Sequence, residues 1–433
     1  MMASGHEGQD SGATARMLPE EGGAGGGLDE RGYARYVLVM LVMLGLSCGV
    51  VGAFNVAIDP FRAFRLGYSE QRFERAWLGT RRVSKGEVLR HGEARVLLLG
   101  TSRVECGFDP AHPGWGTQDA FNMGLGATNL WEVARVFRYA ARHEPLEHVV
   151  LSLDMLMFNS NRQFEWDFRQ SVFNESRRFP EYRLGTMLSW YAIESSRRVL
   201  EREREGAADW TDDRGFLHKP MWPGFHYRGV SMGLLRGFMT NPKSYGPYTD
   251  DGSRWELFQE ILETCAARGI RLTVVLPPSH AMDMEMLWVS GNWEAFEGWK
   301  RRIVSMVEAH EEASGRSVVV WDFTTHGGRN AEVIPGPVDG ATGRRAGEKQ
   351  MMEDWLETSH FTRAYGDDMI ARITGHSGAA GELGVRLTGE MVETHLERLR
   401  ADRAWYVGAF GSDARQVAAL WARVRGMRES GRE

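Results

Sequence analysis

Short aliphatic runs alternate with amphipathic stretches along most of the chain. Five runs are short enough for buried strands: residues 96–99, 120–122, 148–153, 271–276 and 317–322. Apolar residues recur at helical spacing in four further stretches: 129–143, 255–268, 293–310 and 360–373. Strands that alternate with helices predict an α/β fold with a mostly parallel, five-stranded sheet.

An uncharged run of 23 residues, 36–58, precedes this pattern. A helix of that length crosses a hydrocarbon core of about 30 Å. A cleaved signal peptide is the alternative, but its apolar region is only about 7 to 15 residues long and ends at a small-residue cleavage site. The run therefore predicts a single-pass membrane anchor. Arginines flank the run on both sides, so the positive-inside rule is indecisive: Arg31 and Arg35 precede it, and Arg62, Arg65, Arg72 and Arg75 follow it.

The remaining segments complete the predicted domain organisation. Residues 1–35 are rich in glycine and small polar residues and are expected to be disordered. The α/β domain is expected over 59–375, with an insertion at 155–255 because that interval is too long for one strand crossover. Residues 376–433 predict a C-terminal tail of amphipathic helices rich in charged residues, which serve packing or association.

Composition narrows the class of protein. The chain has 433 residues, 42% of them hydrophobic and 25% charged, as in ordinary globular proteins. Its net charge of -6 argues against nucleic-acid binding, which needs a basic surface. Among three cysteines only Cys106 and Cys265 could pair, and neither has the spacing of a zinc ligand.

The segment "VLLLGTSRV" places Ser102 directly after the first strand. Loops at the carboxyl ends of parallel strands carry function in open α/β sheets, so this position suits a nucleophile. It equally suits a residue that caps the next helix, because serine is a favoured cap.

Two further segments bear on the choice. "WLETSHF" places His360 three residues after Glu357, at the expected start of the last helix, so that one turn could supply a base and the acid that orients it. "FNMGLGATN" contains Asn122, Gly124 and Gly126, where bare backbone could approach an oxyanion.

Taken in order, these motifs resemble the SGNH (GDSL-type) hydrolase superfamily, and in particular its membrane-anchored bacterial relatives. Other matching features are the "NVAIDPF" step after the anchor and the third strand that ends in Asp154. The resemblance covers most of 58–373 and implies a flavodoxin-like three-layer sandwich. It implies that Ser102 is the nucleophile, His360 the general base and Glu357 the orienting carboxylate.

The same resemblance implies an oxyanion hole. Its donors would be the N–H groups of Ser102 and of Gly124 or Gly126, together with the side chain of Asn122. Two positions depart from the superfamily pattern: Glu357 replaces the usual aspartate, and Asp154 stands where active members carry an asparagine.

Other polar residues near strand ends have competing interpretations. Arg103 could bind an anionic substrate group, or pair with Asp154 or Glu105. His280, in "PPSH", could contact substrate, although a structural turn is the favoured interpretation. Asp322 and His326 could form an acid-base pair, although capping or loop hydrogen bonds are favoured.

Aromatic residues gather in the insertion. They could stack on sugar rings or form a hydrophobic lid over the sheet. The candidates are Trp166, Trp210, Trp222 and Tyr227.

The resemblance implies an ester hydrolase or O-acyltransferase that acts on acyl esters, with acetyl the expected group, of cell-envelope or secreted polysaccharide. No metal or organic cofactor is expected. The expected location is the inner membrane, with the globular domain on the periplasmic or extracytoplasmic side. The alternative is a catalytically inactive SGNH-like protein that binds a glycan or an envelope protein partner.

Overall fold

The computed structural model describes residues 30–221, 225–336, 351–376 and 383–430. The chain divides into two units, Met1–Val50 and Val51–Glu433. Most of the predicted disordered tail, residues 1–29, lies outside the described residues. Its last residues are helical, because Glu30 to Arg35 extend the apolar helix by more than one turn.

The apolar run forms α1 (Glu30–Ile58). This helix is long and apolar enough, by length and composition, to cross a membrane. Only 6% of its most apolar window is buried, so α1 is not the core helix of a soluble fold. The prediction of a helix long enough for a membrane anchor is confirmed to that extent.

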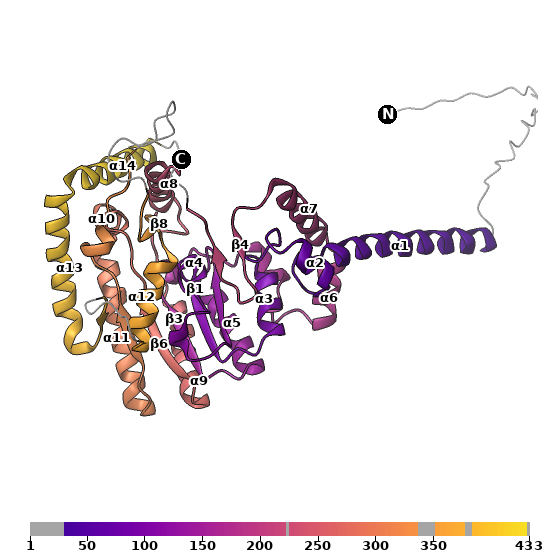
Figure 1. Ribbon diagram of the computed structural model, residues 1–433, viewed down its shortest axis with the longest axis horizontal. Helices are drawn as coiled ribbons and strands as arrows, with labels where there is room; N and C mark the ends of the chain where they lie inside the picture. The colour runs from indigo at the N-terminus through magenta and orange to yellow at the C-terminus, as the bar shows by residue number, and fades with distance from the viewer. Residues whose placement is uncertain (1–29, 222–224, 337–350, 377–382, 431–433) are drawn as a thin grey trace, which may run out of the picture. The chain divides into compact units, whose positions relative to one another are not determined.

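A six-stranded sheet forms the centre of the α/β unit (Figure 1). The strand order is β10-β7-β6-β3-β1-β2, and all neighbours are parallel except the pair β10 and β7. The strands are β1 (Val96–Thr101), β2 (Ala120–Leu125), β3 (His148–Ser152), β6 (Arg271–Leu276), β7 (Val319–Asp322) and β10 (Val385–Arg386). The prediction of an α/β fold with a mostly parallel sheet is confirmed.

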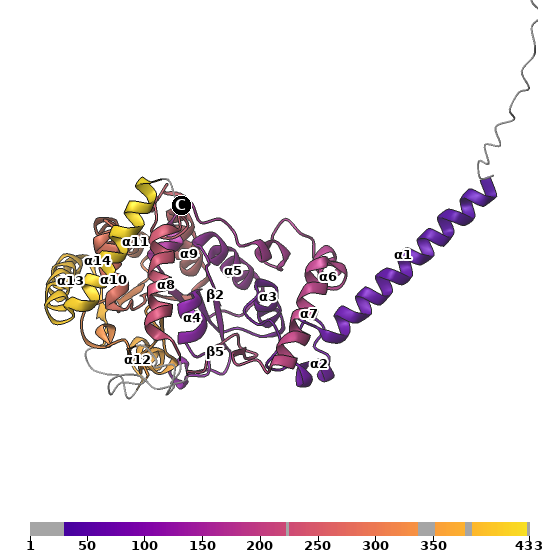
Figure 2. The ribbon, with the colours of Figure 1, turned by 90° about the horizontal axis from the view of Figure 1, so that it is seen from above.

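Helices cover both faces of this sheet. Figure 2 shows α5 and α9 on one side and α4 and α12 on the other, and α11 packs beside α9. The bounds are α4 (Ser102–Gly107), α5 (Leu130–His143), α9 (Ser253–Arg268), α10 (Ala281–Val289), α11 (Trp293–Ser314) and α12 (Arg363–Thr374). Side chains from both layers and from the buried strands form one large hydrophobic core.

The segment after α1 contains α2 (Gly67–Arg72) and α3 (Arg82–His91). Together with the insertion it builds a second hydrophobic cluster that includes Val83 of α3. The insertion contributes short paired strands and three helices. They are α6 (Phe179–Leu188), α7 (Trp190–Glu205), α8 (Tyr227–Thr240), β4 (Trp210–Thr211) and β5 (Leu217–His218). Single 3-10 turns occur at Pro113–Trp115, Met155–Phe158, Trp166–Gln170 and Gly328–Ala331.

Asp59 explains the "IDP" step that follows α1. Its buried carboxylate accepts backbone hydrogen bonds from Ala63, Phe64 and Arg65, at 2.7, 3.0 and 2.8 Å. These bonds close a tight turn in which Asp59 itself has a positive φ of 49°. The turn therefore fixes the last part of α1 to the segment that follows it.

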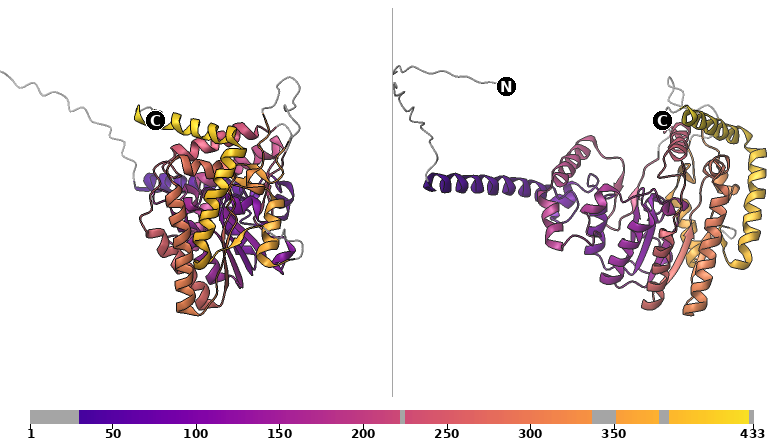
Figure 3. Two further views of the ribbon diagram at one scale, coloured as in Figure 1. Left: turned by 90° about the vertical axis from the view of Figure 1, so that its left-hand side faces the viewer. Right: turned by 180° about the vertical axis from the view of Figure 1, so that it is seen from behind.

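The C-terminal segment forms α13 (Gly389–Ala409) and α14 (Gly411–Glu429). α13 packs on α11, and Figure 3 shows it on the outer side of that helix. A fully buried ion pair joins Lys300 to Asp322 at the end of β7, and His395 of α13 reaches the same carboxylate at 3.0 Å. The C-terminal helices are thus tied to the sheet through buried charge.

Two details of the sequence prediction are wrong. The sheet has a sixth strand, because β10 adds two residues antiparallel to β7, too few for a hydrophobic pattern to reveal. The last helix begins at Arg363 and not at 360, because His360 and Phe361 form β9 and pair with β8 (Trp355–Glu357). Thr362 then caps α12.

Candidate active site

Ser102 is the first residue of α4, directly after β1. The residue that caps α4 is Thr101, whose Oγ1 accepts from the N–H of Arg103 at 3.4 Å. Ser102 therefore does not serve as the helix cap, and its hydroxyl is free for another partner.

That partner is His360. Nε2 of His360 lies 2.7 Å from Oγ of Ser102, across 258 positions of sequence. The β8 and β9 pairing brings Glu357 opposite His360, and Nδ1 of His360 contacts the Glu357 carboxylate. The structure thus brings together the three residues that the sequence singled out as nucleophile, base and acid.

The charge of Glu357 sets the tautomer of His360. Burial alone would raise the pKa of Glu357, but the adjacent His360 and the N–H of Ser359, which donates at 2.7 Å, outweigh it and hold the pKa below its ordinary value. An ionised carboxylate can only accept, so Nδ1 of His360 carries the proton. Nε2 is then the acceptor that faces the Ser102 hydroxyl, as a general base requires.

Cys106 is a second potential nucleophile on α4. Its thiol donates to the carbonyl of Ser102 at 3.0 Å and is buried among Leu217 and Leu356. Burial raises the pKa of Cys106 to about 12, so the thiol stays protonated at neutral pH. Cys106 and Cys265 are both free and buried, so the one pairing that the sequence left open does not form.

Arg103 and Asp154 neutralise each other beside the triad. Nη1 of Arg103 lies 2.6 Å from Asp154, and Thr101 donates to the second oxygen of Asp154 at 2.6 Å. Nε of Arg103 donates to the carbonyl of Ser359 at 2.9 Å, between the acid and the base. Of the alternatives that the sequence left open for Arg103, the structure shows the pairing with Asp154 and not a side chain free to bind substrate. Arg103 therefore positions the triad hairpin, and Asp154 is turned toward this guanidinium.

The assignment of Asn122 to an oxyanion hole is wrong. Its Nδ2 donates to the carbonyls of Val104 and Phe108, both at 2.7 Å, and its Oδ1 accepts from the N–H of Gly124 at 2.9 Å. Both donors of the fully buried amide are used to hold α4 on β2. The N–H of Gly124 is used as well, so Gly124 is not an oxyanion donor.

Gly124 serves packing. A Cβ at this position would lie 2.4 Å from the backbone nitrogen of Glu105, so only glycine allows α4 to approach β2 so closely. Gly126 differs, because it follows β2 and is half-buried. Arg82 donates to its carbonyl at 2.7 Å and fixes this turn, in which Ala127 has a positive φ of 54°.

Three other candidates have structural roles. His280 is buried, caps α10 by accepting from the N–H of Met282 at 3.2 Å, and contacts the carbonyl of Glu332. Burial lowers the pKa of His280 to about 4, so it is a neutral turn residue and not a substrate contact. Asp322 contacts Lys300 rather than His326, whose ring is buried beside Trp293.

The aromatic candidates do not form one stacking surface. Tyr227 is fully buried in the core. Trp210 stacks on His218 with ring centroids 4.1 Å apart. Trp166 is exposed, and Trp222 lies outside the described residues.

Sequence reasoning missed Thr101 and Asp283. Thr101 caps α4 and orients Asp154, and the only sequence signal was its place between Gly100 and Ser102. Asp283 is buried with its carboxylate 3.7 Å from Arg103. It lies in the stretch "AMDMEM", whose two acids, Asp283 and Glu285, are both buried and interrupt the hydrophobic pattern without giving a periodic signal.

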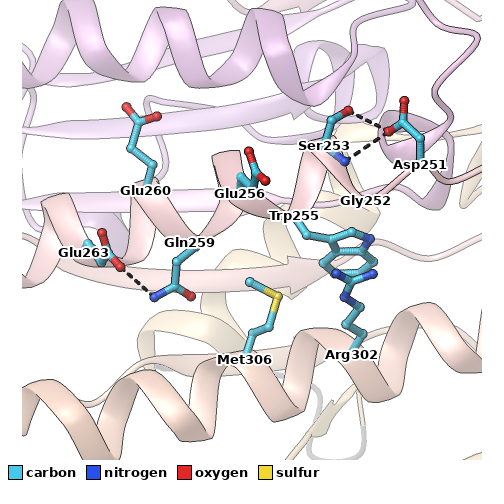
Figure 4. Close-up of a pocket in the computed structure, with 10 residues that line it drawn as sticks. All are labelled: Asp251, Gly252, Ser253, Trp255, Glu256, Gln259, Glu260, Glu263, Arg302 and Met306. Carbon is cyan, nitrogen blue, oxygen red and sulfur yellow. Dashed lines mark hydrogen bonds between the residues drawn. The ribbon is translucent and has the colours of Figure 1, made fainter.

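Several hollows on the described surface lie away from the triad. Figure 4 shows one of about 590 Å³ between α9 and α11, with the acids Glu256, Glu260 and Glu263 on one wall and Arg302 on the other. Within the described ranges, no group of three or more His, Cys, Asp or Glu is arranged to hold a metal ion.

Comparison of the chain with protein-family models, with curated proteins and with solved structures finds no match. The functional argument therefore rests on the geometry around Ser102.

Proposed function

We propose that this protein is an SGNH-type serine esterase or O-acyltransferase with a flavodoxin-like sandwich fold. The observation that carries the proposal is the 2.7 Å contact between Ser102 Oγ and His360 Nε2, completed by Glu357 on the far nitrogen. A serine that caps no helix, with an oriented imidazole at hydrogen-bond distance, is equipped for nucleophilic catalysis.

In the proposed reaction His360 takes the Ser102 proton while Oγ attacks the acyl carbonyl carbon. The resulting imidazolium is stabilised by Glu357 and returns the proton to the leaving alkoxide, which gives an acyl-serine and an alcohol. Water or a second hydroxyl then attacks the acyl carbon while His360 takes its proton. The acyl–Oγ bond breaks, His360 returns the proton to Ser102 Oγ, and the carboxylic acid or the new ester is released. The N–H groups of Ser102, at the first position of α4, and of Gly126 are the proposed oxyanion donors.

The proposed substrate is an acyl ester, with acetyl the favoured group, of a cell-envelope or secreted polysaccharide. This substrate class and the inner-membrane location follow from the resemblance of the sequence to membrane-anchored SGNH-like proteins. An apolar helix long enough to cross a membrane supports an envelope location. The domain is proposed to lie on the extracytoplasmic side, where such polymers are modified.

One observation favours a second function. The side-chain amide of Asn122 and the N–H of Gly124 are already hydrogen-bonded within the packing of α4 on β2. Two of the expected oxyanion donors are therefore missing. An SGNH-like protein without an effective oxyanion hole would bind a glycan or an envelope protein without turning it over.

A serine-directed fluorophosphonate probe distinguishes the two functions. We expect the full chain in detergent micelles to form an adduct on Ser102, located by peptide mass spectrometry. Ser102→Ala and His360→Gln should abolish it. Glu357→Gln should slow labelling by about 10²- to 10⁴-fold, because the amide no longer holds the Nδ1–H tautomer.

His376→Gln is the matched control, because His376 is half-buried just beyond the end of α12, away from Ser102. This variant should be labelled on Ser102 as fast as the wild type. A folded protein that never labels would favour the binding function. With labelling established, release of acetate from O-acetylated polysaccharide, followed by proton NMR, tests the substrate class.

A further inference from the structure

Exposed apolar side chains concentrate in one part of the α/β unit. Most of the large exposed apolar residues that the structure describes after α1 fall between residues 66 and 190: Leu66, Tyr68, Trp166, Phe179, Leu184, Leu188 and Trp190. An exposed apolar concentration of this kind marks a surface that meets another phase or another molecule.

Four of these residues form what we call the juxtahelical patch: Leu184, Leu188, Trp190 and Trp166. Leu184 and Leu188 are one turn apart on the same side of α6, and Trp190 begins α7 two residues later. Trp190 and Trp166 line one hollow of about 510 Å³ together with Tyr191, which meets the Trp166 ring edge to face at 4.8 Å.

The patch adjoins the C-terminal part of α1. Leu188 lies over Gly52, where a Cβ would be only 3.4 Å from its Cδ2. Asn55 donates to the carbonyl of Met187 at 2.7 Å and accepts from Ser196 at 2.8 Å, so its amide is satisfied by α6 and α7. The last two turns of α1 are thus held against these helices on one side.

These contacts begin at Gly52, so they divide the apolar run into residues 36–51 and the last two turns of α1. Residues 36–51, about 16 in number, span about 24 Å at about 1.5 Å per residue. A typical hydrocarbon core is about 30 Å thick. The rest of the hydrocarbon thickness would have to be crossed by Gly52 to Ile58, the part of α1 that α6 and α7 cover on one side.

Other side chains around the patch suit a lipid headgroup region. Arg81, Arg197 and Arg198 line the hollow with the two tryptophans, together with Glu194 and Glu201. Arg197 and Arg198 both pair with Glu201, at 3.5 and 3.2 Å, so Arg81, which lies over the Trp166 ring at 5.6 Å from its centroid, is the arginine proposed to meet a phosphate. Tryptophan and arginine are favoured at the boundary between hydrocarbon and water, where the ring is partly dry and the guanidinium reaches phosphate.

We propose that the juxtahelical patch is inserted in the interfacial zone of the bilayer that α1 crosses, so that the α/β domain rests on the membrane through α6 and α7. Figures 1 and 2 show α2, α6 and α7 grouped together. The proposal goes beyond the acyl-transfer function and does not depend on it.

Site-directed spin labelling of the full chain in vesicles of phosphatidylcholine and phosphatidylglycerol tests the proposal. In a Cys48→Ser background, single labels are placed by Leu184→Cys and Trp190→Cys, while Cys106 and Cys265 are buried and do not react. We expect the ratio of oxygen to nickel-chelate accessibility to be several-fold higher at both positions than at Met391→Cys, an exposed site on α13.

Further labels and a tryptophan variant show how each accessibility ratio is to be interpreted. A label at Leu44→Cys must report hydrocarbon; if it reports water, α1 does not span and the proposal fails. Labels at 184 and 190 that match Met391 overturn the proposal, as do labels shielded from both reagents, which indicate burial against protein. Trp190→Phe offers a check without labels. Brominated lipids should quench part of the tryptophan fluorescence of the wild type, and less of it in the variant.

Discussion

Asp283 is a buried acid behind the triad that the proposed reaction does not use. Burial raises the pKa of Asp283 to about 7, and nearby Glu357 adds to the shift, while Arg103 at 3.7 Å offsets it only in part. The folded chain therefore retains a proton between about pH 4 and pH 7 that the unfolded chain releases. Stability from this group is lost as pH rises through that window.

Asp283→Asn removes the titration and keeps the shape of the neutral acid. The free energy of unfolding of the variant, relative to wild type, should rise between pH 5 and pH 8 by roughly 2 kcal/mol, because each pKa unit is worth about 1.4 kcal/mol. Denaturant unfolding of both proteins across this range measures the difference. A difference that stays constant with pH would show that Asp283 is ionised throughout.

The sequence singled out Ser102 because it follows a strand, and Glu357 and His360 because they lie three residues apart; both are local features. It could not predict the role of Asn122. That role depends on two carbonyls, of Val104 and Phe108, which α4 presents only after it has packed on β2. Arg103 was ambiguous for the same reason, since its partners Asp154 and Ser359 come from distant segments.

Two elements of the site meet through glycines. α4 ends at Gly107, and a Cβ on Gly366 of α12 would lie 1.7 Å from the Gly107 carbonyl oxygen. Because α4 begins with Ser102 and α12 begins three residues after His360, this contact also sets the distance between nucleophile and base. The two helices can hold the triad only if they pack this closely.

Gly366→Ala should push the helices apart and destabilise the protein by about 1 to 3 kcal/mol. Fluorophosphonate labelling should slow by a larger factor than that of an equally destabilised variant, because the Ser102 to His360 contact lengthens. Gly298→Ala is the matched control: it lies in α11 with nothing within 4 Å of the added Cβ, so stability should stay level or rise by up to about 1 kcal/mol. Unchanged labelling in Gly366→Ala would refute the coupling.

Elements with a strong periodic pattern were predicted well, and those defined by pairing were not. The strand at Arg271–Leu276 has the predicted bounds, and β1 and β2 extend only two and three residues further, to Thr101 and Leu125. β8, β9 and β10 have two or three residues each and exist through their partners. Their omission placed His360 on a helix instead of on the short β9 strand.

At the scale of the whole molecule, the sequence predicted a helix long enough for a membrane beside an α/β domain, because both follow from hydrophobic patterning. It could not predict that the last two turns of α1 pack on α6 and α7. That contact depends on Gly52 and Asn55, two residues in a run that composition alone assigns entirely to lipid.

The side of the membrane on which the domain lies is the remaining whole-molecule prediction. Flanking arginines do not decide it, and Arg62 and Arg65, after α1, are paired with Asp213 and Glu70 in the folded domain. The polysaccharide esters proposed as substrate lie outside the cytoplasm, so a C-terminal alkaline phosphatase fusion to the full chain should be active in a bacterial host. A fusion of a cytoplasm-dependent fluorescent protein at the same end should be dark. The reverse pair would place Ser102 in the cytoplasm and exclude envelope polysaccharide as the substrate, even if the serine labels.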